Sequence, residues 1–254
     1  MSSSTRIELI GIPDLPLIER GDDLAAIIAD ALDRSGVRPV AHDVLVVAHK
    51  IVSKAEGRLV DLASVQVSER AARLAKETGK DPRLVEIILS ESVRIVRSRP
   101  GLLIAEHRLG YVMANAGVDQ SNVAPEGRVL LLPRDPDRSA EALRQQLSSR
   151  FGCALAVIIN DSFGRAWRQG TVGIALGVAG LPALRDLRGE PDLFGRKLQV
   201  TIVGFADEIA AAASLIMGQA AEGLPVVLVR GLTWKEASAP ARSLIRPAAE
   251  DLFR

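Results

Sequence analysis

The segment CALAVIIND, residues 153–161, is an unbroken apolar run that ends in Asn160 and Asp161. A run without alternating polar residues is typical of a strand that is buried on both faces of a sheet. Ser162 and FGRAWRQG, residues 163–170, follow it and are interpreted as a glycine turn that carries two arginines. Open α/β sheets bind ligands beyond the carboxyl ends of such strands. This segment therefore predicts an α/β fold and a candidate site at Asp161.

Helix signals occur on both sides of this strand. Asp22 or Asp23 is a plausible N-cap for a first helix, and Gly36 stands where that helix would end. Further helices are predicted over residues 68–79, from the Asp81-Pro82 pair onward, and over residues 139–150 and 207–217.

Apolar segments between these helices predict strands, at residues 43–52, 93–96, 102–105, 111–113, 129–132, 198–205 and 225–230. Residues 170–180 are rich in glycine and small apolar side chains. They form either a loop that approaches a phosphate or a tightly packed segment, and the lack of a Walker lysine favours packing. The pattern predicts a mixed sheet covered by helices, followed by a polar tail with some helical character.

Length and composition limit the class of protein. At 254 residues with 48% hydrophobic residues, the chain can form one domain with a sizeable lobe or two small domains. The 32 Lys and Arg against 31 Asp and Glu give a net charge of +1, which argues against a nucleic-acid partner. Cys153 is the single cysteine, so no disulfide framework is expected. With no apolar amino-terminal segment and no long apolar run, the expectation is a cytoplasmic protein without a membrane span.

A second polar segment, NAGVDQSNV at residues 115–123, combines amide, hydroxyl and carboxylate side chains. An ordinary loop would use the same residue types. However, Asp119 would then be a second carboxylate in a setting similar to that of Asp161. Mg²⁺ and Mn²⁺ favour one or two carboxylates completed by hydroxyls, waters and substrate phosphates, and Asp119 with Asp161 could supply that set.

Five blocks of the sequence, in this order, resemble a known family: LPLIERGDDL, VSKAEGR, NAGVDQSNV, VIINDSFGRAWRQG and ADEIAAAASLIMGQAAEG. They are similar to the γ-glutamyl ligases that add glutamate to the deazaflavin coenzyme F420. The resemblance covers residues 7–232. It implies a two-lobed α/β subunit, distinct from ATP-grasp and Mur ligases, that forms a homodimer.

The resemblance also implies a GTP-dependent amide ligase. GTP would phosphorylate the terminal carboxylate of coenzyme F420-0, and the amine of L-glutamate would attack the acyl phosphate, releasing GDP and phosphate. Mg²⁺ or Mn²⁺ at two sites would neutralise the triphosphate, and K⁺ is a further candidate cofactor. Some bacterial members carry an additional nitroreductase-like domain, which is not expected here.

Individual positions take roles from the same resemblance. Asp119 and Asp161 match ligands of one metal, and Ser162 and Gln219 match ligands of a second; Gln219 stands where archaeal members have Glu. The positions that match the nucleotide site are Leu15, Pro16, Leu17, Ile18, His49, Lys50, Lys54, Asn122, Met217, Gly218, Gln219, Ala220, Ala221, Glu222, Gly223 and Leu224. The His49-Lys50 pair replaces small hydroxyl residues of the family.

Three cationic residues are candidate catalytic groups on their own chemistry. Lys54 offers a compact ammonium to a phosphate, although a lysine is more often a solvated surface residue. Arg165 and Arg168 could grip a phosphodiester or the γ-phosphate, or simply be solvated on a turn. Trp167 between them is either a stacking platform for the deazaflavin or, more commonly for its type, a hydrophobic plug.

Two other functions fit the same residues. A regulatory relative would bind GTP and metal through Asp119, Asp161 and Lys54 without turnover. A phosphotransferase would form an acyl phosphate on a small carboxylate without glutamate.

Overall fold

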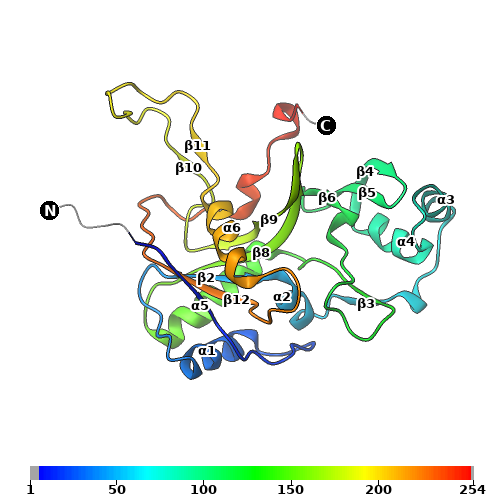
Figure 1. Ribbon diagram of the computed structural model, residues 1–254, viewed down its shortest axis with the longest axis horizontal. Helices are drawn as coiled ribbons and strands as arrows, with labels where there is room; N and C mark the ends of the chain where they lie inside the picture. The colour runs from blue at the N-terminus through cyan, green and yellow to red at the C-terminus, as the bar shows by residue number, and fades with distance from the viewer. Residues whose placement is uncertain (1–5, 253–254) are drawn as a thin grey trace.

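A five-stranded sheet forms the centre of the larger lobe in the computed structural model, which describes residues 6–252 (Figure 1). Its strands lie in the order β1-β12-β2-β8-β9. They are β1 (Glu8–Gly11), β2 (Val44–Ala48), β8 (Ala156–Arg165), β9 (Arg168–Ala179) and β12 (Val226–Arg230). Only β2 and β8 pair in parallel. The mixed α/β fold predicted from the sequence is confirmed.

Helices cover both faces of this sheet. Alternate residues of β2 divide between them: Leu45 and Val47 pack in the core under α1 (Leu24–Arg34), α2 (His49–Ala55) and α5 (Pro136–Phe151). Val44 and Val46 pack in the core under α6 (Phe205–Met217). Because both faces are buried, the strand sequences are continuously apolar.

A smaller lobe stands beside the sheet (Figure 1). It contains α3 (Glu69–Thr78), α4 (Pro82–Ser90) and the antiparallel strands β4 (Ser92–Arg99), β5 (Leu102–His107) and β6 (Val112–Ala114) around their own core. The pair β3 (Leu59–Asp61) and β7 (Arg128–Leu130) leads into and out of it. A buried ion cluster lies where the lobes meet: Glu91 Oε2 is 2.9 Å from Nη2 of Arg58, 2.9 Å from Nη2 of Arg108 and 3.4 Å from Nε2 of His107.

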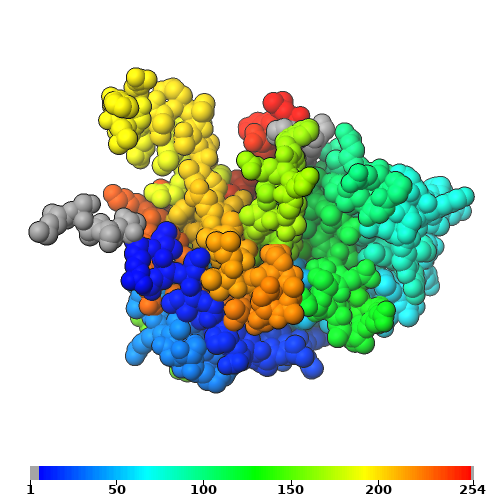
Figure 2. All heavy atoms as spheres, viewed as in Figure 1, coloured from blue at the N-terminus to red at the C-terminus, as the bar shows by residue number. Residues whose placement is uncertain are grey.

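An arm projects away from the larger lobe. It is carried by the short pair β10 (Arg185–Asp186) and β11 (Ile202–Val203), and Figure 2 shows it standing clear of the neighbouring surface. Leu193 is 99% exposed and Phe194 85% exposed at its far end. The strand predicted over residues 198–205 was wrong for most of its length, because only the β11 residues pair and α6 already begins at Phe205.

The predicted helix boundaries are largely confirmed by their caps. Asp23, Ser68 and Asp81 each accept a hydrogen bond from a backbone N–H in the first turn of α1, α3 and α4. Gly79 ends α3 in the left-handed conformation that a glycine adopts without strain. The tail beyond residue 236 contains two short 3-10 turns, Ala241–Leu244 and Ala248–Glu250.

Three predicted boundaries were wrong. The strand expected over residues 43–52 ends at Ala48, and α2 begins at His49. The turn expected before residue 139 is already helical, because Asp135 is the N-cap of α5 and Pro136 occupies its first turn. The β8 strand does not stop at Asp161 but continues to Arg165, since β9 pairs with it antiparallel along its whole length.

The glycine-rich segment 170–180 is a packed strand rather than a phosphate loop. It forms most of β9, where a Cβ on Gly173 would lie 2.1 Å from Ser214 Oγ of α6. A Cβ on Gly177 would lie 2.2 Å from the carbonyl oxygen of Pro136 in α5. Glycine is needed at both positions because helices press directly on the strand.

No helix within residues 6–252 combines the length and the apolar character needed to cross a membrane.

Candidate functional site

The first turn of α2 lies beside the predicted metal ligand Asp161. The register of β2 and β8 pairs Ala48 with Asn160, so the parallel pairing ends one residue before Asp161. His49 follows Ala48 directly and opens α2. The site therefore lies at the carboxyl ends of the parallel pair, as the sequence predicted, although β8 itself runs on.

Lys50 connects α2 to the NAGVDQSNV segment. Its Nζ lies 2.7 Å from Asp119 Oδ2 and donates to Ser121 Oγ at 2.6 Å. Asp119 also accepts the backbone N–H of Ser121 at 2.7 Å, which folds the loop back on its own carboxylate. Backbone hydrogen bonds between Asp119 and Leu130 fix the start of this loop against β7. The carboxylate is thus held in place rather than free on a surface turn.

The surroundings of Asp119 and of Lys54 shift the pKa of each residue. Burial favours the neutral acid at Asp119, but the hydrogen bonds from Lys50 and Ser121 and the charge of Lys50 outweigh it and hold the pKa of Asp119 below its usual range. One turn along α2, Lys54 Nζ donates to the carbonyl oxygen of Asn122 at 3.0 Å. Burial, and then the charge of Lys50, lower the pKa of Lys54.

The second carboxylate lies against the residue before Lys50. Nε2 of His49 is 3.3 Å from Asp161 Oδ1, and the His49 residue is only 2% exposed. The same Oδ1 accepts the backbone N–H of Ser162 at 2.7 Å. Two consecutive residues of α2 therefore hold the two predicted carboxylate ligands, His49 for Asp161 and Lys50 for Asp119.

The segment after α6 closes another side of the site. Asn122 Nδ2 donates to the carbonyl oxygen of Ala220 at 3.0 Å. Glu222 Oε2 accepts the backbone N–H of Ala220 at 2.7 Å, and backbone hydrogen bonds, first that of Ala220, lower the pKa of Glu222. Figure 2 shows the orange segment around residues 218–224 lying against the green segment that follows residue 120. Two predicted nucleotide segments, far apart in the sequence, are thus joined.

Several buried polar side-chain atoms have no hydrogen-bond partner among the described residues. Within residues 6–252 they are His49 Nδ1, Ser53 Oγ, Asn115 Oδ1 and Asn160 Oδ1, and one further such atom, His107 Nε2, lies in the ion cluster between the lobes. A buried polar atom without a partner is costly unless a ligand, an ion or water satisfies it. Carboxylate, hydroxyl and amide oxygens suit Mg²⁺ or Mn²⁺. The donor set therefore fits a divalent cation.

No three His, Cys, Asp or Glu side chains within residues 6–252 form a group that could hold a metal ion. A cation here would depend on hydroxyl, amide and substrate oxygens as well as on Asp119 and Asp161.

The profile of F420-0:Gamma-glutamyl ligase matches residues 13–231. The chain belongs to this ligase family. It is 48% identical to the Coenzyme F420:L-glutamate ligase of Methanothermobacter thermautotrophicus over 250 residues, which cover 98% of this chain and 99% of that relative. It is 49% identical to the enzyme of the same name from Methanopyrus kandleri over 241 residues, 93% of each chain. The Methanocaldococcus jannaschii enzyme is 43% identical over 251 residues, 98% of this chain and 97% of that relative.

Other predicted site residues of this F420-0:Gamma-glutamyl ligase family member lie apart from the carboxylates. Arg165 and Arg168 flank the tight turn between β8 and β9, where Arg165 Nη2 donates to the carbonyl oxygen of Gln169 at 3.4 Å. Trp167 in that turn is 87% exposed. It is therefore not the hydrophobic plug that its residue type favoured.

Residues 15–18 lie in the loop between β1 and α1. Ile18 is buried and Leu15 packs against the core, whereas Pro16 and Leu17 are exposed. All four side chains are apolar, so they can only pack against a ligand and cannot hydrogen-bond to it. Within residues 6–252, no backbone hydrogen bond joins this segment to Asp119 or Asp161.

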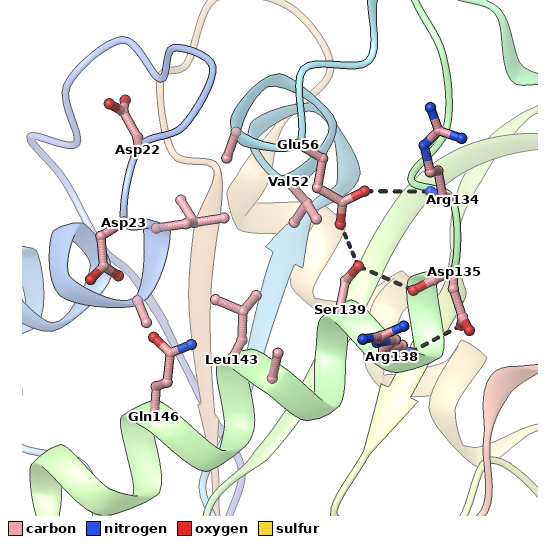
Figure 3. Close-up of a pocket in the computed structure, with 14 residues that line it drawn as sticks. Asp22, Asp23, Val52, Glu56, Arg134, Asp135, Arg138, Ser139, Leu143 and Gln146 are labelled. Carbon is pink, nitrogen blue, oxygen red and sulfur yellow. Dashed lines mark hydrogen bonds between the residues drawn. The ribbon is translucent and has the colours of Figure 1, made fainter.

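A groove of about 550 Å³ lies elsewhere, between α1, α2 and α5. Figure 3 shows Glu56 at its centre, where its carboxylate accepts from Ser139 Oγ and, at 3.4 Å, from the backbone N–H of Arg134. Val52 and Ala55 of α2 and the adjoining Glu56 line it, so it lies on the other side of this helix from Lys50, which contacts Asp119. We therefore do not place the ligase site in this groove.

Asn160 is a site residue that the sequence reasoning did not select. It is 3% exposed, and its Nδ2 donates to Ser214 Oγ of α6 at 3.1 Å. The signal was present, since Asn160 is a polar residue inside an apolar strand, directly before Asp161.

Proposed function

We propose that this protein catalyses the GTP-dependent addition of L-glutamate to the terminal carboxylate of coenzyme F420-0, with release of GDP and phosphate. Relatives of 39–49% identity are named Coenzyme F420:L-glutamate ligase and are matched over nearly their full length, which supports the acceptor and the amino acid. The observation that carries the rest is the placement of Asp119 and Asp161 against consecutive residues of α2.

The reaction needs two displacement steps. A carboxylate oxygen of F420-0 attacks the γ-phosphorus of GTP, and the bond from that phosphorus to the bridging oxygen breaks, so that GDP leaves. The amine nitrogen of glutamate then attacks the acyl carbon, the carbon–oxygen bond to phosphate breaks, and the amine loses a proton. The first step makes a poor acyl donor reactive. In its transition state negative charge is spread over the oxygens of the transferred phosphoryl group.

The cationic side chains of α2 are suited to that charge. Lys50 and Lys54 lie one turn apart on one face of the helix and reach the loop that contains Asp119 and Asn122. A lysine ammonium is a point-charge partner for phosphate oxygens. In this proposal Lys54 stabilises the transferred phosphoryl group, while Lys50 orients Asp119 and binds the triphosphate.

Asp119 and Asp161 would hold one Mg²⁺ or Mn²⁺, and Ser162 with Gln219 a second; these ions supply charge neutralisation for the triphosphate. The chain's own residues fix the geometry around them. His49 orients Asp161, and Ser121 orients Asp119 through two hydrogen bonds, of 2.7 Å and 3.1 Å. The hydrogen bond from Asn122 to Ala220 joins two segments that would both contact the nucleotide in this proposal.

Arg165 and Arg168 are proposed to bind the phosphodiester of F420-0, with Trp167 stacking on its deazaflavin. The support is the exposure of Trp167 at the turn between β8 and β9, together with the planar guanidinium groups beside it. Since β8 runs from Asp161 to Arg165, the same strand would position both ends of the reacting complex.

A homodimer is proposed as the functional form. The projecting arm carries Leu193, Phe194 and Val200, which are 99%, 85% and 85% exposed. Large apolar side chains grouped on an extended arm are typical of a surface that another protein covers.

The test is GDP release by the purified protein with GTP, Mn²⁺, L-glutamate and F420-0, omitting each in turn, with product mass followed for glutamyl additions. GDP release that requires both acceptors, with a mass increase of glutamyl units, supports the ligase. GTP binding without GDP release would instead identify a regulatory relative. GDP release without glutamate, with an acyl phosphate trapped by hydroxylamine, would identify a phosphotransferase.

A further inference from the structure

We infer that Asn160 supplies an oxygen ligand to a divalent cation bound beside Ser162 and Gln219. The inference rests on the proposed function, in which those two residues hold a second cation. Its basis is the orientation of one buried amide, the position of its oxygen and the neighbouring residues.

The hydrogen bonds of Ser214 fix the orientation of the Asn160 amide. Ser214 Oγ donates to the carbonyl oxygen of Ala210 at 3.0 Å, and a hydroxyl has only one proton to donate. In this arrangement it accepts from Asn160 Nδ2 at 3.1 Å, so the amide nitrogen faces α6. Asn160 Oδ1 then faces away from Ser214. Among the described residues it has no hydrogen-bond partner, although Asn160 is only 3% exposed.

Such an oxygen is costly to bury. An unsatisfied acceptor has lost the hydrogen bonds to water that it makes in the unfolded chain. A simple packing role would be served by an apolar side chain without this cost. The retention of a polar group here favours a role in ligand binding.

The close approach of Asn160 Oδ1 to Gly173 shows where this oxygen lies. Asn160 and Ser162 are two residues apart in β8, so their side chains lie on the same face of the sheet. Gly173 of β9 is the direct cross-strand partner of Ser162, and a Cβ on Gly173 would lie 2.8 Å from Asn160 Oδ1. The oxygen therefore reaches over Gly173, beside the strand position of Ser162.

The same side chain connects this strand to the end of α6. Asn160 Nδ2 lies 3.5 Å from Met217 Sδ, two residues before Gln219. Asn160 thus lies at the carboxyl end of α6, from which the chain continues to Gln219, and Asn160, Ser162 and Gln219 each carry a neutral oxygen. Such hard oxygen donors suit Mg²⁺ or Mn²⁺. Because the set contains no carboxylate, we expect this cation to bind more weakly than the one at Asp119 and Asp161.

The test is a Mn²⁺ titration of the full-length protein with a non-hydrolysable GTP analogue, in which free Mn²⁺ is measured by electron paramagnetic resonance. The wild type should bind two Mn²⁺ with different affinities. Asn160→Ala should weaken the second one by at least roughly tenfold and leave the first unchanged. Asn160→Asp, which has nearly the same shape and adds a charge, should tighten it by a similar factor.

Two controls separate ligation from structure. Thr78→Ala removes a buried hydroxyl in α3 of the smaller lobe, where Oγ donates to the carbonyl oxygen of Leu74, and should leave the titration unchanged. Ser214→Ala removes the contact to α6 but keeps Oδ1, so it should affect Mn²⁺ binding less than Asn160→Ala does. The melting temperature of each variant is measured alongside. If Asn160→Ala does not fold, the Asn160→Asp titration decides.

A single Mn²⁺ in the wild type, or an unchanged second affinity in both Asn160 variants, overturns the inference; the buried oxygen would then be satisfied by an ordered water. Glutamyl addition by the same preparation is measured separately. If the wild type adds glutamate but the Asn160 variants bind Mn²⁺ with unchanged affinities, only the inferred role of Asn160 is refuted. Loss of the second Mn²⁺ in Asn160→Ala, with no ligation by the wild type, refutes the proposed function and supports this inference.

Discussion

Lys50 Nζ and Asp119 Oδ2 lie 2.7 Å apart, and this ion pair joins the helix that follows β2 to a loop contributed from a distant part of the chain. The partner groups are neither fully exposed nor sealed, since their side chains are 24% and 32% exposed. Substrate phosphates and cations can therefore compete for either partner. The pair holds both charges in place before substrates arrive, which lowers the ordering cost of binding.

The first prediction concerns acid stability. The pKa of Asp119 in the folded protein is depressed below its ordinary value of 3.8, so its stabilising contribution is fully present above that value and is lost as the pH falls through the lower, folded-state pKa. The melting temperature of Asp119→Asn should therefore fall less steeply with pH below about 4 than that of the wild type. Equal slopes in thermal melts between pH 6 and pH 2.5 would contradict the linkage.

The second prediction concerns phosphoryl transfer. Lys54→Ala should lower kcat for glutamate addition by about a hundredfold, because one preorganised cation near the transferred group is lost. Lys54→Arg should restore part of the rate. Lys76→Ala, in α3 of the smaller lobe, is the matched control and should match the wild type. Steady-state GDP release gives kcat for all three variants. A wild-type kcat in Lys54→Ala would mean that Lys54 is a surface lysine without a catalytic role.

The third prediction concerns the projecting arm. Leu193→Asp combined with Phe194→Asp should convert a dimer into monomers, since two charges would be buried in the proposed apolar contact. Light scattering after size-exclusion chromatography gives the mass. Val93→Asp changes an exposed apolar residue, 66% exposed, on β4 of the other lobe and should leave the mass unaltered. A monomeric wild type, or a double variant that remains dimeric, would exclude the arm as the interface.

The fourth prediction concerns the contact between β9 and α6. Gly173→Ala should lower the free energy of unfolding by about 2–3 kcal/mol, because its Cβ meets both a side chain and the backbone of α6. Gly164→Ala, in β8, has open space around the new Cβ and is the matched control. Urea denaturation of both variants tests the difference, which should be visible as a shift of the midpoint for Gly173→Ala only.

The fifth prediction concerns the ion cluster between the lobes. Glu91→Ala should cost about 3–5 kcal/mol of unfolding free energy, because it leaves the buried Arg58 without its anion. Glu69→Ala removes one member of the exposed pair with Arg73 and should have no measurable effect. Chemical denaturation compares the two. Similar midpoints would mean that the cluster contributes no more than a surface pair.

The sequence located the main elements because their signals are local. The apolar run before Asp161, the capping residues Asp23 and Ser68, and the terminal Gly79 each act within a few residues of themselves. The predicted boundaries were wrong where pairing with a distant segment determines the end of an element. The β8 strand continues past Asp161 only because β9 returns alongside it, and no property of residues 162–165 alone shows this.

For the candidate site, too, some features follow from the sequence and others only from the tertiary structure. The sequence by itself determined the ligase family, the oxygen-rich segments and the carboxylates Asp119 and Asp161, because residue type and order along the chain carry that information. Only the tertiary structure decided that His49 holds Asp161, that Lys50 holds Asp119 and that the Asn160 oxygen has no hydrogen-bond partner within residues 6–252. Hydrogen bonds and ion pairs depend on distances of about 3 Å between atoms from segments far apart in the chain, and packing of the helices on the sheet sets those distances.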